Sequence, residues 1–192
     1  MKPVSKYLLL EKLETRVEGH LADAVRIFQN LPEALLLNPS ATGGWSIAQC
    51  LEHLNRYGNY YLPQIQSGLN KKVPGGNTFK STWLGSYFTK MMEPSTGTKK
   101  VKAFKDYIPP TQLNAHAVVA EFIAQQETLL AYLKQARATD LNAVKIPVSI
   151  AKWIRLRLGD VLQFIIAHNE RHMVQAKRNI GSDLTILKIE AV

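Results

Sequence analysis

Residues 45–54 read Trp-Ser-Ile-Ala-Gln-Cys-Leu-Glu-His-Leu and contain the clearest helix start in the chain. Ser46 and Gln49 have the spacing of a capping box, in which the serine oxygen accepts a hydrogen bond from the Gln49 N–H and the glutamine side chain accepts one from the Ser46 N–H. Apolar residues then recur at helical spacing, which predicts a helix that continues to about Leu69. Pro63 lacks a backbone donor and is expected to kink this helix.

Three further segments show the same helical periodicity. They cover about residues 5–31, 115–137 and 160–180, and each carries a stripe of apolar residues along one face. Gly181 is expected to cap the last of them. A helix of roughly 20 residues is about 30 Å long, and four such helices bury their stripes most simply against one another. The sequence therefore predicts an all-α fold, a four-helix bundle.

Shorter elements are also indicated. Pro32 and Pro39 interrupt the chain after the first helix, and one extra helical turn is expected between them at residues 33–37. Weak alternation of apolar and polar residues marks two short candidate strands, at residues 144–150 and 184–189.

The composition is that of one soluble globular domain, and we treat residues 1–192 as a single domain. Of its 192 residues, 46% are apolar and 20% are charged. No apolar run reaches the roughly 18 residues that span a bilayer, and the apolar stretch near the N-terminus is too short for a secretory signal. The single cysteine, Cys50, cannot form an internal disulfide, so the expected location is the reducing cytoplasm.

The positive charge is concentrated in one segment. The chain has 24 lysines and arginines against 15 acids, a net charge of +9. Eight of the lysines and one acid, Glu93, lie between Asn70 and Lys105, so that this part alone contributes +7. Its glycines and prolines indicate mostly loop, with one helix of about ten residues near 83–92. We expect residues 70–110 to form a long basic crossover connection between the second and third helices.

Three of the five histidines form a candidate metal site. His168 and His172 are four residues apart in the last predicted helix, so that their imidazoles lie on one face and can share an ion. His53 lies beside the apolar stripe of the second helix and completes the set if these two helices face each other. Three neutral ligands leave coordination positions open for water or substrate, which is typical of a catalytic site. The alternative is that these histidines are hydrogen-bonded packing residues.

Two motifs resemble those of the DinB-like superfamily. Residues 44–54, Gly-Trp-Ser-Ile-Ala-Gln-Cys-Leu-Glu-His-Leu, are similar to its Trp-Ser…His-Leu helix start. Residues 162–175, Leu-Gln-Phe-Ile-Ile-Ala-His-Asn-Glu-Arg-His-Met-Val-Gln, are similar to its His-x-x-x-His helix. The resemblance implies a bundle in an up-down-down-up arrangement, a homodimer, and one divalent metal ion held by His53, His168 and His172.

The resemblance also implies classes of reaction. Characterised members of the superfamily include thiol S-transferases that use bacillithiol or related small thiols, a mycothiol-dependent isomerase and proposed metal-dependent hydrolases. We therefore expect a metal-dependent hydrolase or thiol S-transferase, in which the ion activates water or a low-molecular-weight thiol. The expected ion is zinc, nickel or iron, although imidazole ligands also suit copper.

Four further residues are candidates for the pocket wall or for supporting the ligands: Gln49, Tyr57, Gln175 and His20. The two glutamines lie about one helical turn from a proposed ligand, as does Tyr57. His20 is interpreted first as a packed histidine with a backbone partner. Cys50 is interpreted as a small core residue rather than a nucleophile.

Basic residues are candidates for holding the carboxylates of an acidic thiol: Lys71, Lys72, Lys99, Lys100, Arg155 and Arg157. The same charge leaves two alternative functions open. One is a nucleic-acid or polyanion-binding module that stacks bases on the aromatic residues of the basic segment. The other is a bundle that binds a metal ion without turnover. Nucleic acid is the less favoured partner, because the chain has no recognisable nucleic-acid-binding motif.

Overall fold

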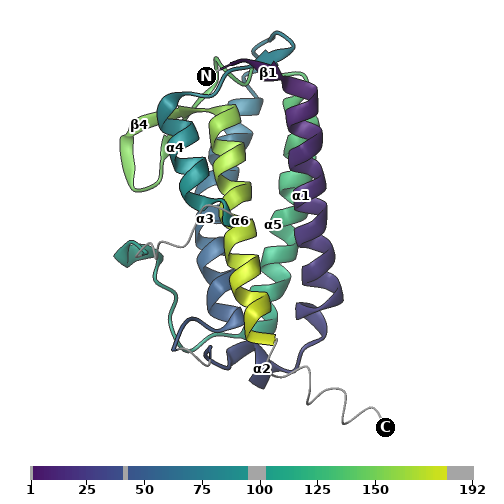
Figure 1. Cartoon of the computed structure of the whole chain (residues 1–192), viewed down its shortest axis with the longest axis vertical. Coiled ribbons are helices and arrows are strands. Elements are labelled where there is room, and N and C mark those ends of the chain that lie inside the picture. The colour runs from purple at the N-terminus through teal and green to yellow at the C-terminus, as the bar shows by residue number, and fades with distance from the viewer. Residues whose placement is uncertain (1, 41–42, 95–102, 181–192) are drawn as a thin grey trace.

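Four long helices form the body of the protein. The computed structural model describes residues 2–40, 43–94 and 103–180. The long helices are α1 (Lys6–Arg26), α3 (Ile47–Leu69), α5 (Ala115–Ala136) and α6 (Leu158–Ile180), and they pack side by side (Figure 1). The four predicted helices are confirmed, and their boundaries shift by a few residues. The predicted cap at Gly181 lies outside the described residues.

Short elements join the long helices: β1 (Val4–Ser5), η1 (Phe28–Asn30), α2 (Glu33–Leu37), β2 (Thr78–Phe79), α4 (Trp83–Met92), η3 (Lys105–Tyr107), β3 (Lys145–Val148) and β4 (Ala151–Arg157). β1 pairs with β2 and β3 pairs with β4, both antiparallel. The expected strand within 144–150 is confirmed, whereas the one at 184–189 lies outside the described residues. Because two small sheets are present, the fold is mostly helical rather than purely all-α.

The capping box at the start of α3 is present as the sequence predicts. The Ser46 oxygen accepts a hydrogen bond from the Gln49 N–H, and the Gln49 side chain accepts one from the Ser46 N–H, each at 3.1 Å. Pro63 lies inside α3. The box fixes where the helix begins and therefore which of its residues face α6.

Contacts between side chains define the directions of the helices. Asn55 of α3 donates to the carbonyl of Val118 in α5 at 2.9 Å. Further along both helices, Gln125 donates to Asn59 at 3.0 Å, so α3 and α5 run in the same direction. Lys177, in the last turn of α6, forms an ion pair with Asp23, in the last turn of α1. The C-terminal ends of α1 and α6 therefore lie together, and these two helices also run in the same direction.

The start of α1 is fixed to the end of α5 by a buried lysine. Lys6 is 2% exposed, and its amine donates to the carbonyls of Arg137 at 2.7 Å and Thr139 at 3.4 Å. Carbonyls at a helix C-terminus lack partners within the helix and carry partial negative charge, so they stabilise a cation there. This contact also shows that α1 and α5 are antiparallel.

Replacing Lys6 with methionine is expected to lower the free energy of unfolding by about 2 kcal/mol, because charge-assisted hydrogen bonds are lost and buried carbonyls lose their donor. Urea unfolding followed by circular dichroism measures the change. Lys12 is an exposed lysine in the same helix, and Lys12→Met serves as the matched control. Equal stability of the two variants would show that the buried amine contributes nothing.

Helix α4, in the segment between α3 and α5, spans the ten predicted residues and packs along α6 (Figure 1). Asp160, at the start of α6, is fully buried and accepts hydrogen bonds from the hydroxyl of Ser81 and from the backbone N–H and hydroxyl of Thr82. A Cβ atom at Gly85 would collide with the Asp160 carboxyl group. The two helices therefore meet at their N-terminal ends through one buried carboxylate.

The core of the bundle is divided into two apolar clusters. One cluster contains the second half of α3 with the first half of α6, and the other contains the opposite halves of these helices. Between them lie buried polar side chains from three helices: His53, Asn55, Gln126, His168 and Asn169. The candidate metal ligands belong to this polar layer. None of the helices in the described part of the chain is long and apolar enough to cross a membrane.

Candidate metal centre

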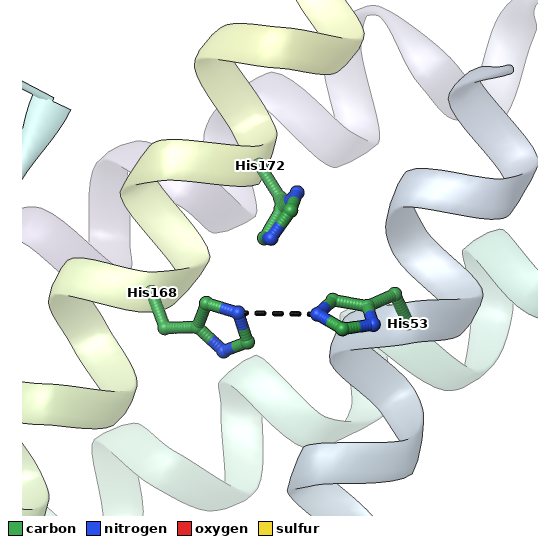
Figure 2. A group of neighbouring side chains, drawn as sticks. All are labelled: His53, His168 and His172. Atoms are coloured by element: carbon green, nitrogen blue, oxygen red, sulfur yellow. Dashed lines mark hydrogen bonds between the residues drawn. The ribbon is translucent and has the colours of Figure 1, made fainter. Parts of the chain in front are cut away.

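The structure brings together the three histidines that the sequence singles out. His53 comes from α3 and His168 and His172 from α6, and Figure 2 shows their imidazoles converging between the two helices. One ring nitrogen of each lies within 4.8 Å of the others. The Nε2 atoms of His53 and His168 are 3.2 Å apart, close to the spacing of about 3.3 Å between two nitrogens that share a tetrahedral zinc ion.

Hydrogen bonds orient two of the three rings. The Nδ1–H of His53 donates to the backbone carbonyl of Tyr107 at 2.7 Å, and the Nδ1–H of His172 donates to the side-chain oxygen of Gln175 at 2.9 Å. Each bond places the proton on Nδ1 and leaves the Nε2 lone pair facing the cluster, as metal ligation requires. The Nδ1 atom of His168 is buried and has no hydrogen-bond partner among the described residues.

Burial keeps the three imidazoles neutral. Removal from water lowers the pKa of His53 and lowers that of His172 to about 3. The pKa of His168 is lowered well below its ordinary value, first by burial and then by the neighbouring imidazoles His172 and His53. Neutral imidazole is the form that binds metal ions. The donor set, its spacing and its protonation state therefore fit one divalent ion.

The depressed pKa of His172 makes the metal-free protein less stable in acid. An unfolded histidine takes up a proton below about pH 6.5, whereas folded His172, with a pKa of about 3, does not. Between these values the unfolded state binds more protons, so the free energy of unfolding falls as the pH falls. At pH 5 we expect His172 to account for a loss of about 2 kcal/mol relative to pH 7.5.

Urea unfolding of the metal-free protein at the two pH values measures this loss. His172→Asn should reduce the difference between pH 7.5 and pH 5. His116, an exposed histidine at the start of α5, provides the matched control, since His116→Asn should retain the wild-type difference. An unchanged pH dependence in His172→Asn would contradict the assignment.

Aromatic rings surround the cluster. The ring centroid of Trp45 lies 4.8 Å from that of His53, and the ring of Tyr57 lies 4.5 Å from that of His168. Phe164 stacks on His168 from one turn earlier in α6, with centroids 5.8 Å apart. Burial raises the pKa of the Tyr57 phenol. These rings restrict the access of water to the imidazoles.

The histidines line a large cavity of about 1030 Å³ between α3, α6 and the connection. Its walls include the neighbouring aromatic residues Trp45, Tyr57, Tyr61, Phe88 and Phe164. Within the described ranges, no aspartate or glutamate lines it. A cavity of this size accommodates a small molecule, and it brings that molecule directly to the imidazoles.

The predicted supporting residues have different positions. Tyr57 and Gln175 line the cavity. Gln49 completes the capping box and also donates to the carbonyl of Pro110 at 3.2 Å, and it is not part of the cavity wall. His20 is buried outside the cavity and bonds to the carboxylate of Glu170 at 2.7 Å, so the predicted backbone partner is wrong.

Glu170 takes part in a network that leads away from the imidazoles. Its bond from His20 lowers the pKa of the Glu170 carboxyl group. Arg16 lies 3.8 Å from Glu170 and forms a paired hydrogen bond with Glu93. Glu170, which lies between His168 and His172 in the sequence, is therefore bound by side chains of α1 instead of facing the metal centre. Cys50 is fully buried, and burial raises the pKa of its thiol to about 12, consistent with a core residue.

Four of the predicted anion-binding residues lie within the described part of the chain, and none of these four lines the cavity. Lys71 and Lys72 follow the C-terminal end of α3, whose last residue, Leu69, lies about 24 Å along the helix axis from His53. Arg155 is exposed on β4, and Arg157 donates to the carbonyl of Lys80. Lys99 and Lys100 lie outside the described residues.

Two arginines of α6, Arg171 and Arg178, line the cavity instead. The sequence pattern does not single them out, because they are adjacent to other charged or polar residues and lie outside the lysine-rich segment. Nor does it indicate the Tyr107 carbonyl, since a backbone acceptor has no signature in the sequence. Trp45 and Phe164 were visible in the two motifs, but their contacts with the imidazoles depend on helix packing.

Comparisons with known proteins found one family model and one solved structure that match the chain. The family model of the DinB superfamily matches residues 16–176, which include all three histidines. The chain is similar in structure to YfiT from Bacillus subtilis, with a TM-score of 0.53 and 14% identity over 92% of this chain and 86% of that one. YfiT is described as "a probable metal-dependent hydrolase with an unusual four-helix bundle topology". None of the curated proteins matches the chain. Because the family match covers most of its length, the chain belongs to the DinB superfamily.

Proposed function

We propose that the protein is a metal-dependent enzyme that binds one divalent ion through His53, His168 and His172 and acts on a small molecule. The proposed reaction is hydrolysis or the transfer of a low-molecular-weight thiol. One observation carries the proposal: three neutral imidazoles converge at the wall of a cavity large enough for a substrate. A structural metal site would be closed by a fourth protein ligand, and the described residues offer only these three.

A divalent ion held there supplies Lewis acidity, which lowers the pKa of a water or thiol at an open coordination position. The protein contributes the orientation of its ligands. The carbonyl of Tyr107 holds His53, and the side chain of Gln175 holds His172, so neither ring needs to reorganise when an ion binds. Tyr57 and Phe164 cover the rings on the apolar side and limit competing water.

No carboxylate among the described cavity residues is placed as a general base. Glu52 pairs with Arg56 at 2.8 Å, and Glu170 is held by His20. We therefore propose that the nucleophile loses its proton to solvent or to the substrate rather than to a side chain of the wall. The comparison with YfiT favours hydrolysis over thiol transfer, since that neighbour is described as a hydrolase.

Elemental analysis of the native protein, purified without a histidine tag, tests the proposal. We expect about one divalent ion per chain, with zinc, nickel and iron as the ions to be measured. Protein that contains no ion and takes none up from a solution of each would overturn it. Homodimer formation is part of the same proposal, and analytical ultracentrifugation measures it directly.

A further inference from the structure

The cavity that holds the histidines is chemically different at its two ends. Phe164, His168 and Arg178 all line it from α6. Phe164 and Arg178 are fourteen residues apart, which corresponds to about 21 Å along the helix axis. The histidines therefore lie between an end marked by Phe164 and an end marked by Arg178.

The Phe164 end is apolar. Tyr61 is 1% exposed and Phe164 is 8% exposed, and their rings meet edge to face with centroids 5.9 Å apart. Phe88 of α4 contacts Phe164 in the same way at 6.3 Å. The buried side chains of Val148 and Leu156, from the hairpin of β3 and β4, extend this wall. An apolar group of a ligand would lose its contact with water here.

The other end is cationic. Arg171 lines the wall, and its guanidinium donates to the carbonyl of Met91 at 3.2 Å, which fixes its position beside the histidines. Arg178 lies two turns further along α6 and is exposed at the mouth of the cavity. Among the described residues, the carboxylate of Glu170 is paired with His20 and that of Glu93 with Arg16.

We infer that the cavity binds an amphipathic anion, whose carboxylate or phosphate is held by Arg171 and Arg178 and whose apolar group lies against Phe164. Guanidinium groups bind both kinds of anion through paired, charge-assisted hydrogen bonds. The reactive bond of such a ligand lies between its two ends, next to the histidines. We infer that this amphipathic anion is the substrate class of the proposed function. Its reaction depends on the proposed function, whereas its binding to the cavity does not.

Calorimetric titration of the full chain, freed of metal with a chelator, tests the binding. The probes are decanoate, decyl phosphate and 1-decanol, which share one alkyl chain and differ in the head group. We expect at least one of the two anions to bind roughly tenfold more tightly than the alcohol, because a charge-assisted hydrogen bond is worth about that factor. The tighter of the two identifies the class of anion.

Arg178→Gln and Arg171→Gln should each weaken binding of the anion about tenfold and leave binding of 1-decanol unchanged. Arg155→Gln and Lys72→Gln remove basic side chains that lie outside the cavity, so they are the matched controls and should bind all three probes like the wild type.

Equal affinity for the anions and the alcohol would overturn the inference. So would a loss of anion affinity in Arg155→Gln or Lys72→Gln as large as that in Arg171→Gln or Arg178→Gln. Binding of decanoate only to the metal-loaded protein would also overturn it, since the ion rather than the arginines would then hold the anion. Because the titration uses metal-free protein, its result is independent of whether the native protein carries an ion. The prediction of metal content and the prediction of anion binding can therefore be refuted independently.

Discussion

Protein in which His168 is replaced by alanine is expected to contain less than a tenth of the metal found in the wild type. Of the three imidazoles, His168 is the most deeply enclosed, 2% exposed, and its ring contacts both partner rings, with centroids 5.0 Å from His53 and 4.8 Å from His172. Its removal leaves two nitrogens, one on each helix, and the structure offers no replacement ligand among the described residues. A site that has lost one of three protein ligands loses most of its affinity.

The measurement is elemental analysis after purification without a histidine tag, followed by titration of the chelated protein with each candidate ion. His116→Ala serves as the control, because this histidine is exposed at the start of α5 and belongs to no cluster of ligands within the described residues. Circular dichroism should show the same helix content in both variants. Retention of wild-type metal content by His168→Ala would refute the assignment of the site.

Asp160→Ala is expected to cause the largest loss of stability, about 3 kcal/mol. The carboxylate is fully buried and accepts hydrogen bonds from Ser81 and from two groups of Thr82. Hydrogen bonds to a charged group contribute about 1.5–3 kcal/mol each, and the truncation leaves buried donors without an acceptor. Because these donors precede α4, the variant also frees that helix from the start of α6.

Urea unfolding of the purified variants measures the effect. Asp160→Asn keeps one acceptor oxygen and should lose less stability than Asp160→Ala. Glu127 is an exposed acid on α5, and Glu127→Ala should stay within about 0.5 kcal/mol of the wild type. If Asp160→Ala were as stable as Glu127→Ala, the buried carboxylate would not be holding α4 in place.

The local elements could be predicted from the sequence because their signals lie within a few neighbouring residues. The capping box at Ser46 gives the start of α3, and two prolines enclose the short helix Glu33–Leu37. The sequence predicts the start of α6 at about Asp160, whereas the helix begins at Leu158, since strand β4 leads into it directly. The sequence does not predict β4, because Leu156 is its only buried residue and its apolar pattern is therefore weak.

The candidate site could be predicted only as far as its ligands. The spacing of His168 and His172 shows that they share a face, and the motif at His53 indicates the partner helix. What surrounds them depends on the three-dimensional order of the helices. The bond between His20 and Glu170 joins α1 to α6, and no local pattern distinguishes Glu170 from the other acids of the chain. The sequence likewise does not show that Arg171 and Arg178 line the cavity, because this depends on how α6 is rotated about its own axis.

The hydrogen bond that orients His53 is accepted by the backbone carbonyl of Tyr107, which lies in the segment between α3 and α5. Every residue other than proline presents the same carbonyl and N–H groups, and even proline keeps the carbonyl. Substitutions at position 107 therefore leave this acceptor in place, whereas an insertion or deletion nearby would shift it. The connection can thus diverge in sequence during evolution at constant length while the metal centre stays intact.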